Sequence, residues 1–249
     1  LMGLDSQDPR GERPILPGPS GYSKPLITPK GDRVIFSKPS EDGVYVVDWD
    51  GGGERRLASG FALALWQDPE SGREWVYVGS KRRRREPTSY RVIERHQIDH
   101  PELSEPVWNG EPVTINSFQI SRDGRFAGGL FPWPKAGVAD LETGTWRPLG
   151  EGCWTAFAAD DSHLFWFFDG SHRNLTIVDV DGDRRWRVAI NDAPGMRGFE
   201  VYHPRWTNQP RFLAVTCPYT VGDAANKIRG GGPQVEIFLG RFAADFTSV

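Results

Sequence analysis

The sequence predicts an all-β protein, a β-propeller of about five four-stranded blades, from three observations. The chain of 249 residues combines 29 Gly and 20 Pro with 10 Trp and 14 Phe, and this mixture of turn formers and strand formers is typical of many short strands. A turn centred on Gly or Asp and followed by an apolar strand recurs about every 40–50 residues, the span of one blade. No long window shows the helical period of apolar residues.

The clearest copy of this unit is Ile27–Leu57, ITPKGDRVIFSKPSEDGVYVVDWDGGGERRL. Its turn at Pro29–Asp32 precedes a strand at Arg33–Ser37. A second strand at Gly43–Asp48 leads through a glycine turn into a third at Arg55–Leu57. Further copies of the turn and its strand lie at residues 68–80, 121–130, 159–168 and 207–216.

This unit resembles the repeat of TolB-type (WD40-like, PD40) β-propellers, in which an SPDG turn, a strand, a strand ending in DxDG and an RRLT segment follow one another. The first copy matches well, and SRDGRFAGG…GVADLETGTWRPL and LTIVDVDGDRRWRV match in part. The second and fifth copies keep only the spacing, and the resemblance covers about Tyr22 to Leu239. It implies a non-enzymatic binding or scaffolding domain, often periplasmic, although such blades also occur beside hydrolase domains.

We expect one domain over residues 1–249, with blades at approximately 22–60, 61–110, 111–150, 151–192 and 193–249. The polar segment 1–21 cannot form a core of its own, and few residues follow Leu239 to make a last outer strand. An open ring would leave unpaired strand edges, which aggregate. We therefore expect Arg13–Leu16 to supply the outer strand of the last blade and close the ring.

Charge and hydropathy exclude several classes of partner. The net charge of −3, from 30 basic and 33 acidic residues, gives no global field that would attract nucleic acid. No apolar run approaches the roughly 20 residues that span a bilayer, and the first residues lack the apolar core of a signal peptide. We expect a periplasmic or extracellular location with a targeting segment outside this chain, and further domains of the same chain stay open as partners.

Cys153 and Cys217 match no metal or redox spacing and are expected to be free thiols, with a disulfide as the alternative.

Blade topology sorts the connections onto two faces, tight turns on one and long loops on the other, and long loops on a rigid scaffold usually carry function. On the long-loop face, the basic run is either an anion site or a solvated hairpin tip. Trp133, between two prolines, is either a platform for a sugar or proline-rich peptide or an aromatic folded over the blade edge. His172 and Arg173 are neighbouring polar candidates. The basic run consists of Lys81, Arg82, Arg83, Arg84 and Arg85.

The first strand of each blade is expected to line the central channel of the propeller. Glu200 is the only carboxylate on these strands, whereas glycoside hydrolysis usually needs two. Tyr202, His203 and Arg205 make one channel entry polar, either as a binding site or as a structural cluster. The expected first strands are Tyr22–Thr28, Phe61–Gln67, Thr114–Ser121, Cys153–Ala158 and Phe199–Arg205.

The favoured function is a non-catalytic binding or scaffold propeller that recognises a protein, peptide or glycan through the long-loop face and channel mouth. No catalytic residue, metal ligand or cofactor is expected, because the sequence contains no constellation or spacing for them. The alternative is an enzyme or enzyme subdomain, a hydrolase or lyase acting on an acidic carbohydrate or a peptide, centred on Glu200, Tyr202, His203 and Arg205. A purely structural module is the third interpretation.

Overall fold

The computed structural model describes residues 1–5, 7–9, 11–83, 86–182, 184–207, 209, 211–219 and 235–249, with the side chains of residues 81–87 excepted. The chain is an all-β protein whose strands form antiparallel sheets with the topology of propeller blades, which confirms the predicted fold class. Two compact units, Leu1–Ile115 and Asn116–Val249, are described here in turn. The assignment of residues 1–249 to a single domain stays a prediction.

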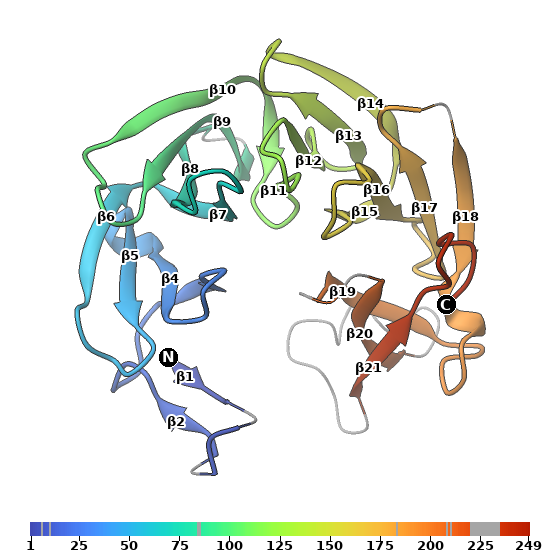
Figure 1. Cartoon of the computed structure of the whole chain (residues 1–249), viewed down its shortest axis with the longest axis horizontal. Helices are drawn as coiled ribbons and strands as arrows, with labels where there is room; N and C mark the ends of the chain where they lie inside the picture. The colour runs from blue at the N-terminus through green and yellow to red at the C-terminus, as the bar shows by residue number, and fades with distance from the viewer. Residues whose placement is uncertain are drawn as a thin grey trace. The chain divides into compact units, whose positions relative to one another are not determined.

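The first unit contains two four-stranded blades (Figure 1). In each blade the strands are antiparallel and neighbours in sequence are neighbours in the sheet. A short 3₁₀ helix, η1 (Pro39–Glu41), joins two strands of the first blade. The first blade consists of β3 (Ser23–Ile27), β4 (Arg33–Lys38), β5 (Gly43–Asp48) and β6 (Arg55–Ser59), and the second of β7 (Phe61–Gln67), β8 (Glu74–Arg83), β9 (Glu86–Gln97) and β10 (Ser104–Thr114).

The two blades of this unit share an apolar core and a buried ion pair. Ile35 and Val46 of the first blade pack with Val76 of the second, because the middle strands are covered on both faces. Arg33 donates through Nη2 to the carboxylate of Glu74 at 2.6 Å, and the Glu74 side chain is completely buried. The same carboxylate accepts the Lys30 backbone N–H at 3.1 Å. This contact ties the blades together at their tight-turn ends.

The two short strands of the N-terminal segment pair with each other. They are β1 (Met2–Gly3) and β2 (Arg13–Pro14). Ile15 and Leu16 are buried against Val34 and Phe36 of the first blade. Ile15 and Leu16 therefore bury their side chains on the first blade, and closure of the ring by Arg13–Leu16 stays a prediction.

The second unit contains two four-stranded blades and a last blade with three described strands (Figure 1). The 3₁₀ helix η2 (Ile190–Asp192) precedes the last blade. The third blade consists of β11 (Gln119–Ile120), β12 (Phe126–Leu130), β13 (Lys135–Asp140) and β14 (Thr145–Glu151), the fourth of β15 (Cys153–Phe157), β16 (Leu164–Phe168), β17 (Asn174–Asp179) and β18 (Arg185–Ala189), and the fifth of β19 (Glu200–Trp206), β20 (Phe212–Tyr219) and β21 (Glu236–Arg241).

The aromatic strand β16 joins the three blades of this unit. Successive side chains of a strand point to opposite faces. Accordingly, Trp166 and Phe168 pack in the core that contains Leu213 of the fifth blade, whereas Phe165 packs in the core that contains Phe126 of the third. All five residues of β16 are buried. This packing holds the first strands of the fourth and fifth blades, β15 and β19, in contact.

Most predicted strands are found near their expected positions, and the largest difference concerns the basic run. The predicted irregular loop is instead largely a hairpin, because β8 extends to Arg83, which pairs with Glu86 at the start of β9. Arg84 and Arg85 lie outside the described residues. In the part of the chain that the structure describes, no helix is long and apolar enough to cross a membrane.

Candidate functional site

A cluster of polar and aromatic side chains lies where the fourth and fifth blades meet in the second unit. It brings together five of the predicted site residues, His172, Glu200, Tyr202, His203 and Arg205, and adds two that the sequence does not predict as site residues, Cys153 and Trp154. Strands β15 and β19 and the β16–β17 connection supply these side chains. We call this set the His172 cluster. Its members are Cys153, Trp154, His172, Glu200, Tyr202, His203 and Arg205.

Three residues of the His172 cluster have left-handed backbone conformations. Trp154, His172 and His203 have φ values of 53°, 53° and 52°. Trp154 and His203 lie at irregularities in the pairing of β15 and β19, and bulges of this kind re-aim side chains. A left-handed residue other than Gly costs about 1–3 kcal/mol and persists only where its surroundings hold it. Their concentration at one site marks this part of the molecule as a candidate functional site.

The β16–β17 connection places His172 against the first strands. Its backbone N–H donates to the carbonyl of Asp169 at 3.1 Å, and its own carbonyl accepts the N–H of Val201 at 3.0 Å. The imidazole Nε2 lies 3.0 Å from Cys153 Sγ, and the ring centroid is 4.2 Å from that of Tyr202. Nδ1 is buried without a hydrogen-bond partner among the described residues.

The Cys153–His172 pair is electrically neutral near pH 7. Burial raises the pKa of the Cys153 thiol to about 12, and the negative charge of Asp169 adds to the effect. Burial also lowers the pKa of His172, outweighing the opposite influence of Glu200 and Asp169. A nucleophilic cysteine needs a depressed pKa, as in a thiolate–imidazolium pair. The contact is therefore a hydrogen bond between neutral groups.

Tyr202 engages the only carboxylate of the cluster. Its hydroxyl donates to Glu200 Oε2 at 2.9 Å, and its side chain is buried between the rings of His172 and Tyr219. Burial and the hydrogen bond to Glu200 raise the pKa of the Tyr202 phenol. Glu200 is thus held as a hydrogen-bond acceptor.

The hydrogen bonds around Thr216 assign the tautomer of His203. Burial and the charge of Arg205 lower the pKa of His203, so the ring is neutral near pH 7. The Thr216 hydroxyl donates to the Tyr202 carbonyl at 3.1 Å, so it accepts from His203 Nδ1 at 2.9 Å. This assignment leaves His203 Nε2 as an acceptor. The His203 ring meets the Trp154 ring edge-on at 5.0 Å.

Arg205 lies over the other aromatic group of the site. Its guanidinium carbon is 5.7 Å from the centroid of the Trp154 ring, within the range of a cation–π contact. Nη1 donates to the carbonyl of the neighbouring Pro204 at 3.3 Å. The side chain is exposed by surface area, so water reaches it, while the surrounding protein lowers its pKa by desolvation.

The remaining predicted residues are placed elsewhere. Trp133 lies in the β12–β13 connection and is 66% exposed, whereas the adjacent Phe131 is buried and stacks on Trp146 with ring centroids 5.3 Å apart. The Arg173 backbone N–H donates to Asp169 Oδ1 at 3.1 Å, and its Nε is buried without a partner among the described residues. Arg82 and Arg83 belong to β8 in the first unit, and their side chains lie outside the described part.

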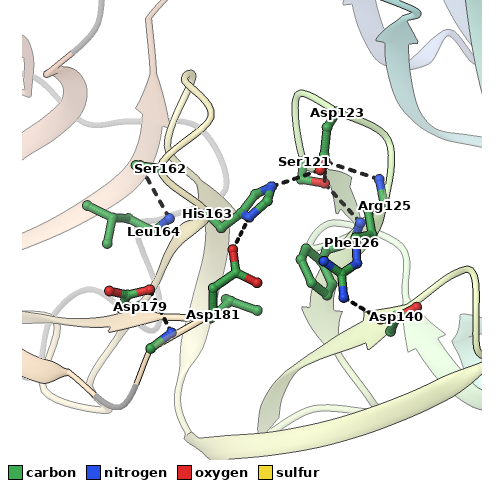
Figure 2. Close-up of polar contacts among 12 residues, drawn as sticks. Ser121, Asp123, Arg125, Phe126, Asp140, Ser162, His163, Leu164, Asp179 and Asp181 are labelled. Carbon is green, nitrogen blue, oxygen red and sulfur yellow. Dashed lines mark hydrogen bonds and ion pairs between the residues drawn. The ribbon is translucent and has the colours of Figure 1, made fainter.

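A second polar cluster lies at the tight-turn ends of the third and fourth blades (Figure 2). His163, just before β16, donates through Nε2 to Asp123 in the β11–β12 turn at 2.9 Å and contacts Asp181 in the β17–β18 turn through Nδ1. We call these three residues the His163 clasp. Burial alone would lower the pKa of His163, but the hydrogen bonds and negative charges of Asp181 and Asp123 raise it. The clasp links the two blades and is an ion triad in its protonated form.

No group of three or more His, Cys, Asp or Glu side chains within the described ranges is arranged to hold a metal ion. The two cysteines are free thiols, with Cys217 buried and Cys153 half-buried. The Asp179 side chain accepts the backbone N–H of Gly182 at 3.0 Å, as expected for hairpin-turn chemistry.

Comparison of the structure with solved structures finds propellers. A protein assigned as TolB from Agrobacterium tumefaciens superposes with a TM-score of 0.58 at 16% identity, covering 93% of this chain and 86% of that one. The chain has a TolB-type propeller fold. The β-propeller domain of Cps50 (Swd1) from Myceliophteria thermophila gives a TM-score of 0.54 at 13% identity over 80% of this chain and 62% of that one. Hydrazine synthase of Kuenenia stuttgartiensis gives 0.54 at 15% identity over 86% and 66%.

Sequence comparison adds no closer relationship. No family model matches the sequence, and no curated protein matches it. The identities to the TolB-type and other propellers are low, so these similarities show the fold alone. Function therefore has to be argued from the site.

Proposed function

We propose that this TolB-type propeller is a non-catalytic binding module that recognises a protein, peptide or glycan through the His172 cluster and the neighbouring long loops. The observation that supports this most directly is the grouping of Trp154, His172 and His203, all left-handed, at one meeting point of two blades. Such conformations concentrate at ligand sites, because the fold that imposes them also fixes the direction of the side chains.

The protonation states favour binding over catalysis. The Cys153 thiol, with its raised pKa, is not a nucleophile near pH 7, and Glu200 is engaged by the Tyr202 hydroxyl. His172 and His203 have neutral rings beside the half-buried Trp154 ring and the exposed Arg205 guanidinium, groups suited to hydrogen bonding and stacking. Catalysis by this cluster would need an ionised nucleophile or an unengaged carboxylate. Cys153 and Glu200 do not provide these in the free protein.

The TolB-type fold guides the rest of the proposal. We infer that Trp133 and the basic run of β8 add contacts on the long-loop face, because loops on a rigid scaffold are where propellers present variable chemistry. A periplasmic or extracellular location, inferred from the resemblance alone, is tested by fractionating cells that express the full-length protein. Recovery of the protein with cytoplasmic markers would contradict it.

The function is tested by screening the purified chain on peptide and glycan arrays and titrating the strongest ligand against variants. His203→Asn removes the imidazole while keeping a residue that tolerates the left-handed conformation. We expect it to weaken binding at least about tenfold, the loss of one good polar contact. Trp133→Ala is expected to weaken binding as well.

Leu103→Ala is the control, since Leu103 is 50% exposed and lies in the first unit. Thermal unfolding of each variant separates a local effect from loss of the fold. Unchanged affinity in both His203→Asn and Trp133→Ala would contradict the proposed face. Chemical turnover of the array ligand by the wild type, lost in His203→Asn, would overturn the non-catalytic role.

A further inference from the structure

We propose that Arg205, supported by the Trp154 ring, is an anchor for a carboxylate group of the ligand. The inference rests on the proposed binding function and deepens it by naming the chemistry that is recognised. Acidic peptide side chains and the uronate units of a glycan both present this group.

Arg205 has no carboxylate partner among the described residues, in contrast to several arginines of the second unit. Arg125, Arg184 and Arg187 form ion pairs with Asp140, Asp179 and Asp169 at 3.4, 3.4 and 3.0 Å. Arg205 forms no ion pair with any described residue; it contacts the Trp154 ring and the Pro204 carbonyl. Within the described ranges, no acidic side chain therefore neutralises its charge.

The surroundings of Arg205 make an incoming anion favourable. Desolvation lowers the pKa of its guanidinium, and no acidic neighbour among the described residues offsets that cost. For Arg33, by contrast, the hydrogen bonds that it donates to Asp99 and Glu74 outweigh desolvation, so its pKa rises. A bound carboxylate would accept hydrogen bonds from Arg205 and compensate its charge, as Asp99 and Glu74 do for Arg33.

The geometry also suits a carboxylate more than a point-like anion. The guanidinium carbon lies over the Trp154 ring, and the N–H groups of a guanidinium lie in its plane, where only Nη1 is engaged by a described residue, the Pro204 carbonyl. A planar fork of donors matches the two oxygens of a carboxylate, and the aromatic support reduces the rotamer entropy lost on binding. Glu200, the nearest carboxylate in sequence, is engaged by Tyr202 and does not fill this position.

Calorimetric titrations of the whole chain with four probes test the inference. Triglutamate and trigalacturonate carry carboxylates on a peptide and on a glycan, and triglutamine and trigalactose are their neutral counterparts. We expect at least one acidic probe to bind and its neutral counterpart to bind at least about tenfold more weakly, with affinity falling as salt is added. Binding of triglutamate points to a peptide ligand, and binding of trigalacturonate points to a glycan ligand.

Arg205→Gln is expected to weaken binding of the acidic probe by about 10- to 100-fold. Arg205→Lys is expected to weaken it less, because lysine keeps the charge but loses the planar pair of N–H donors. Arg197→Gln is the matched control, since Arg197 is an exposed arginine of the same unit without a described ion pair. The affinity of Arg197→Gln for the acidic probe is expected to stay within about twofold of the wild-type value. Thermal unfolding confirms that each variant is folded.

Three outcomes would overturn the inference: no binding of either acidic probe, equal binding of acidic and neutral probes, or equal effects of Arg205→Gln and Arg197→Gln. An array ligand that loses affinity in His203→Asn but not in Arg205→Gln would overturn the carboxylate anchor and leave the proposed function intact. An array without any ligand would count against the proposed function itself.

Discussion

The His163 clasp predicts a pH-dependent stability that can be worked through from its geometry. The perturbation is His163→Asn, which keeps a residue that tolerates the left-handed conformation of His163 (φ 50°) but cannot reach both carboxylates. In the wild type, both ring nitrogens contact carboxylates, and only the doubly protonated imidazolium can donate to both (Figure 2). The variant therefore removes an ion triad that spans two blades.

The magnitude follows from the two charge-assisted hydrogen bonds and their exposure. Such bonds contribute about 1.5–3 kcal/mol each when buried, but Asp123 and Asp181 are 36% and 52% exposed. Solvent screening reduces the sum, so we expect His163→Asn to lower the free energy of unfolding by about 1–2 kcal/mol below pH 6.5. For a chain of this size the melting temperature would fall by roughly 2–4 °C per kcal/mol.

The sign of the pH dependence follows from the direction of the shift. The pKa of His163 is raised in the folded state, so the stabilisation is fully present below the unfolded value of about 6.5. It is lost as the pH rises through the folded pKa, because a neutral ring donates to one carboxylate only. The assay is urea unfolding of wild type and His163→Asn between about pH 5.5 and 9.

The control is His100→Asn, whose imidazole is 61% exposed and contacts one carboxylate, that of Glu102, at 3.3 Å. It is expected to change the free energy of unfolding by less than about 0.5 kcal/mol at every pH. A His163→Asn difference that is absent, or that stays constant across the pH range, would refute the reasoning.

Three further predictions concern stability and reactivity. Glu74→Gln leaves Arg33 with an incomplete set of charged partners in a buried site, so the free energy of unfolding should fall by about 3 kcal/mol or more in urea titrations; a loss below about 1 kcal/mol would contradict the role of the pair. Tyr202→Phe removes the hydrogen bond to Glu200 and should cost about 1.5–3 kcal/mol in the same assay, and an unchanged midpoint would show that the bond contributes nothing. With its pKa at about 12, Cys153 in the folded protein should react far more slowly with iodoacetamide near neutral pH than after denaturation, as measured by peptide mass spectrometry; rapid labelling of the native chain would contradict the neutral pair.

The sequence predicts the blades well because their signals are local. Turn residues and alternating apolar residues determine where a strand begins, and β5 (Gly43–Asp48) has the predicted bounds. The ring-closing strand was a topological inference instead. The structure pairs Arg13–Pro14 with Met2–Gly3, because the adjacent Ile15 and Leu16 find an apolar surface on the first blade.

The sequence predicts most readily the part of the candidate site whose residues share one strand. Glu200, Tyr202 and His203 lie together on β19 and are recognisable as a polar group, whereas the partners Cys153 and Trp154 come from β15. The Cys153–His172 contact joins two parts of the fourth blade that are 19 residues apart, and the Trp154–His203 contact crosses from the fourth blade to the fifth, so neither leaves a local signal. Trp is not a typical left-handed residue, so the conformation of Trp154 is not predictable from the sequence.

The His163 clasp did leave a signal in the repeat. Asp123 and His163 occupy the first turn of consecutive blades, and these turns lie at the same end of neighbouring sheets. Aligning the copies by their turns would have brought the two residues together despite their separation of 40 positions. Spacings of metal ligands or catalytic residues along the chain do not relate equivalent turns of different blades.

The central claim, that the His172 cluster binds an acidic ligand through Arg205, is tested most directly by a crystal structure of the chain with the tighter of triglutamate and trigalacturonate. We expect a ligand carboxylate at about 2.7–2.9 Å from the guanidinium nitrogens of Arg205, with Trp154 beneath the guanidinium and His203 beside it. A ligand bound with its carboxylates away from Arg205, or bound outside the His172 cluster, would contradict the claim.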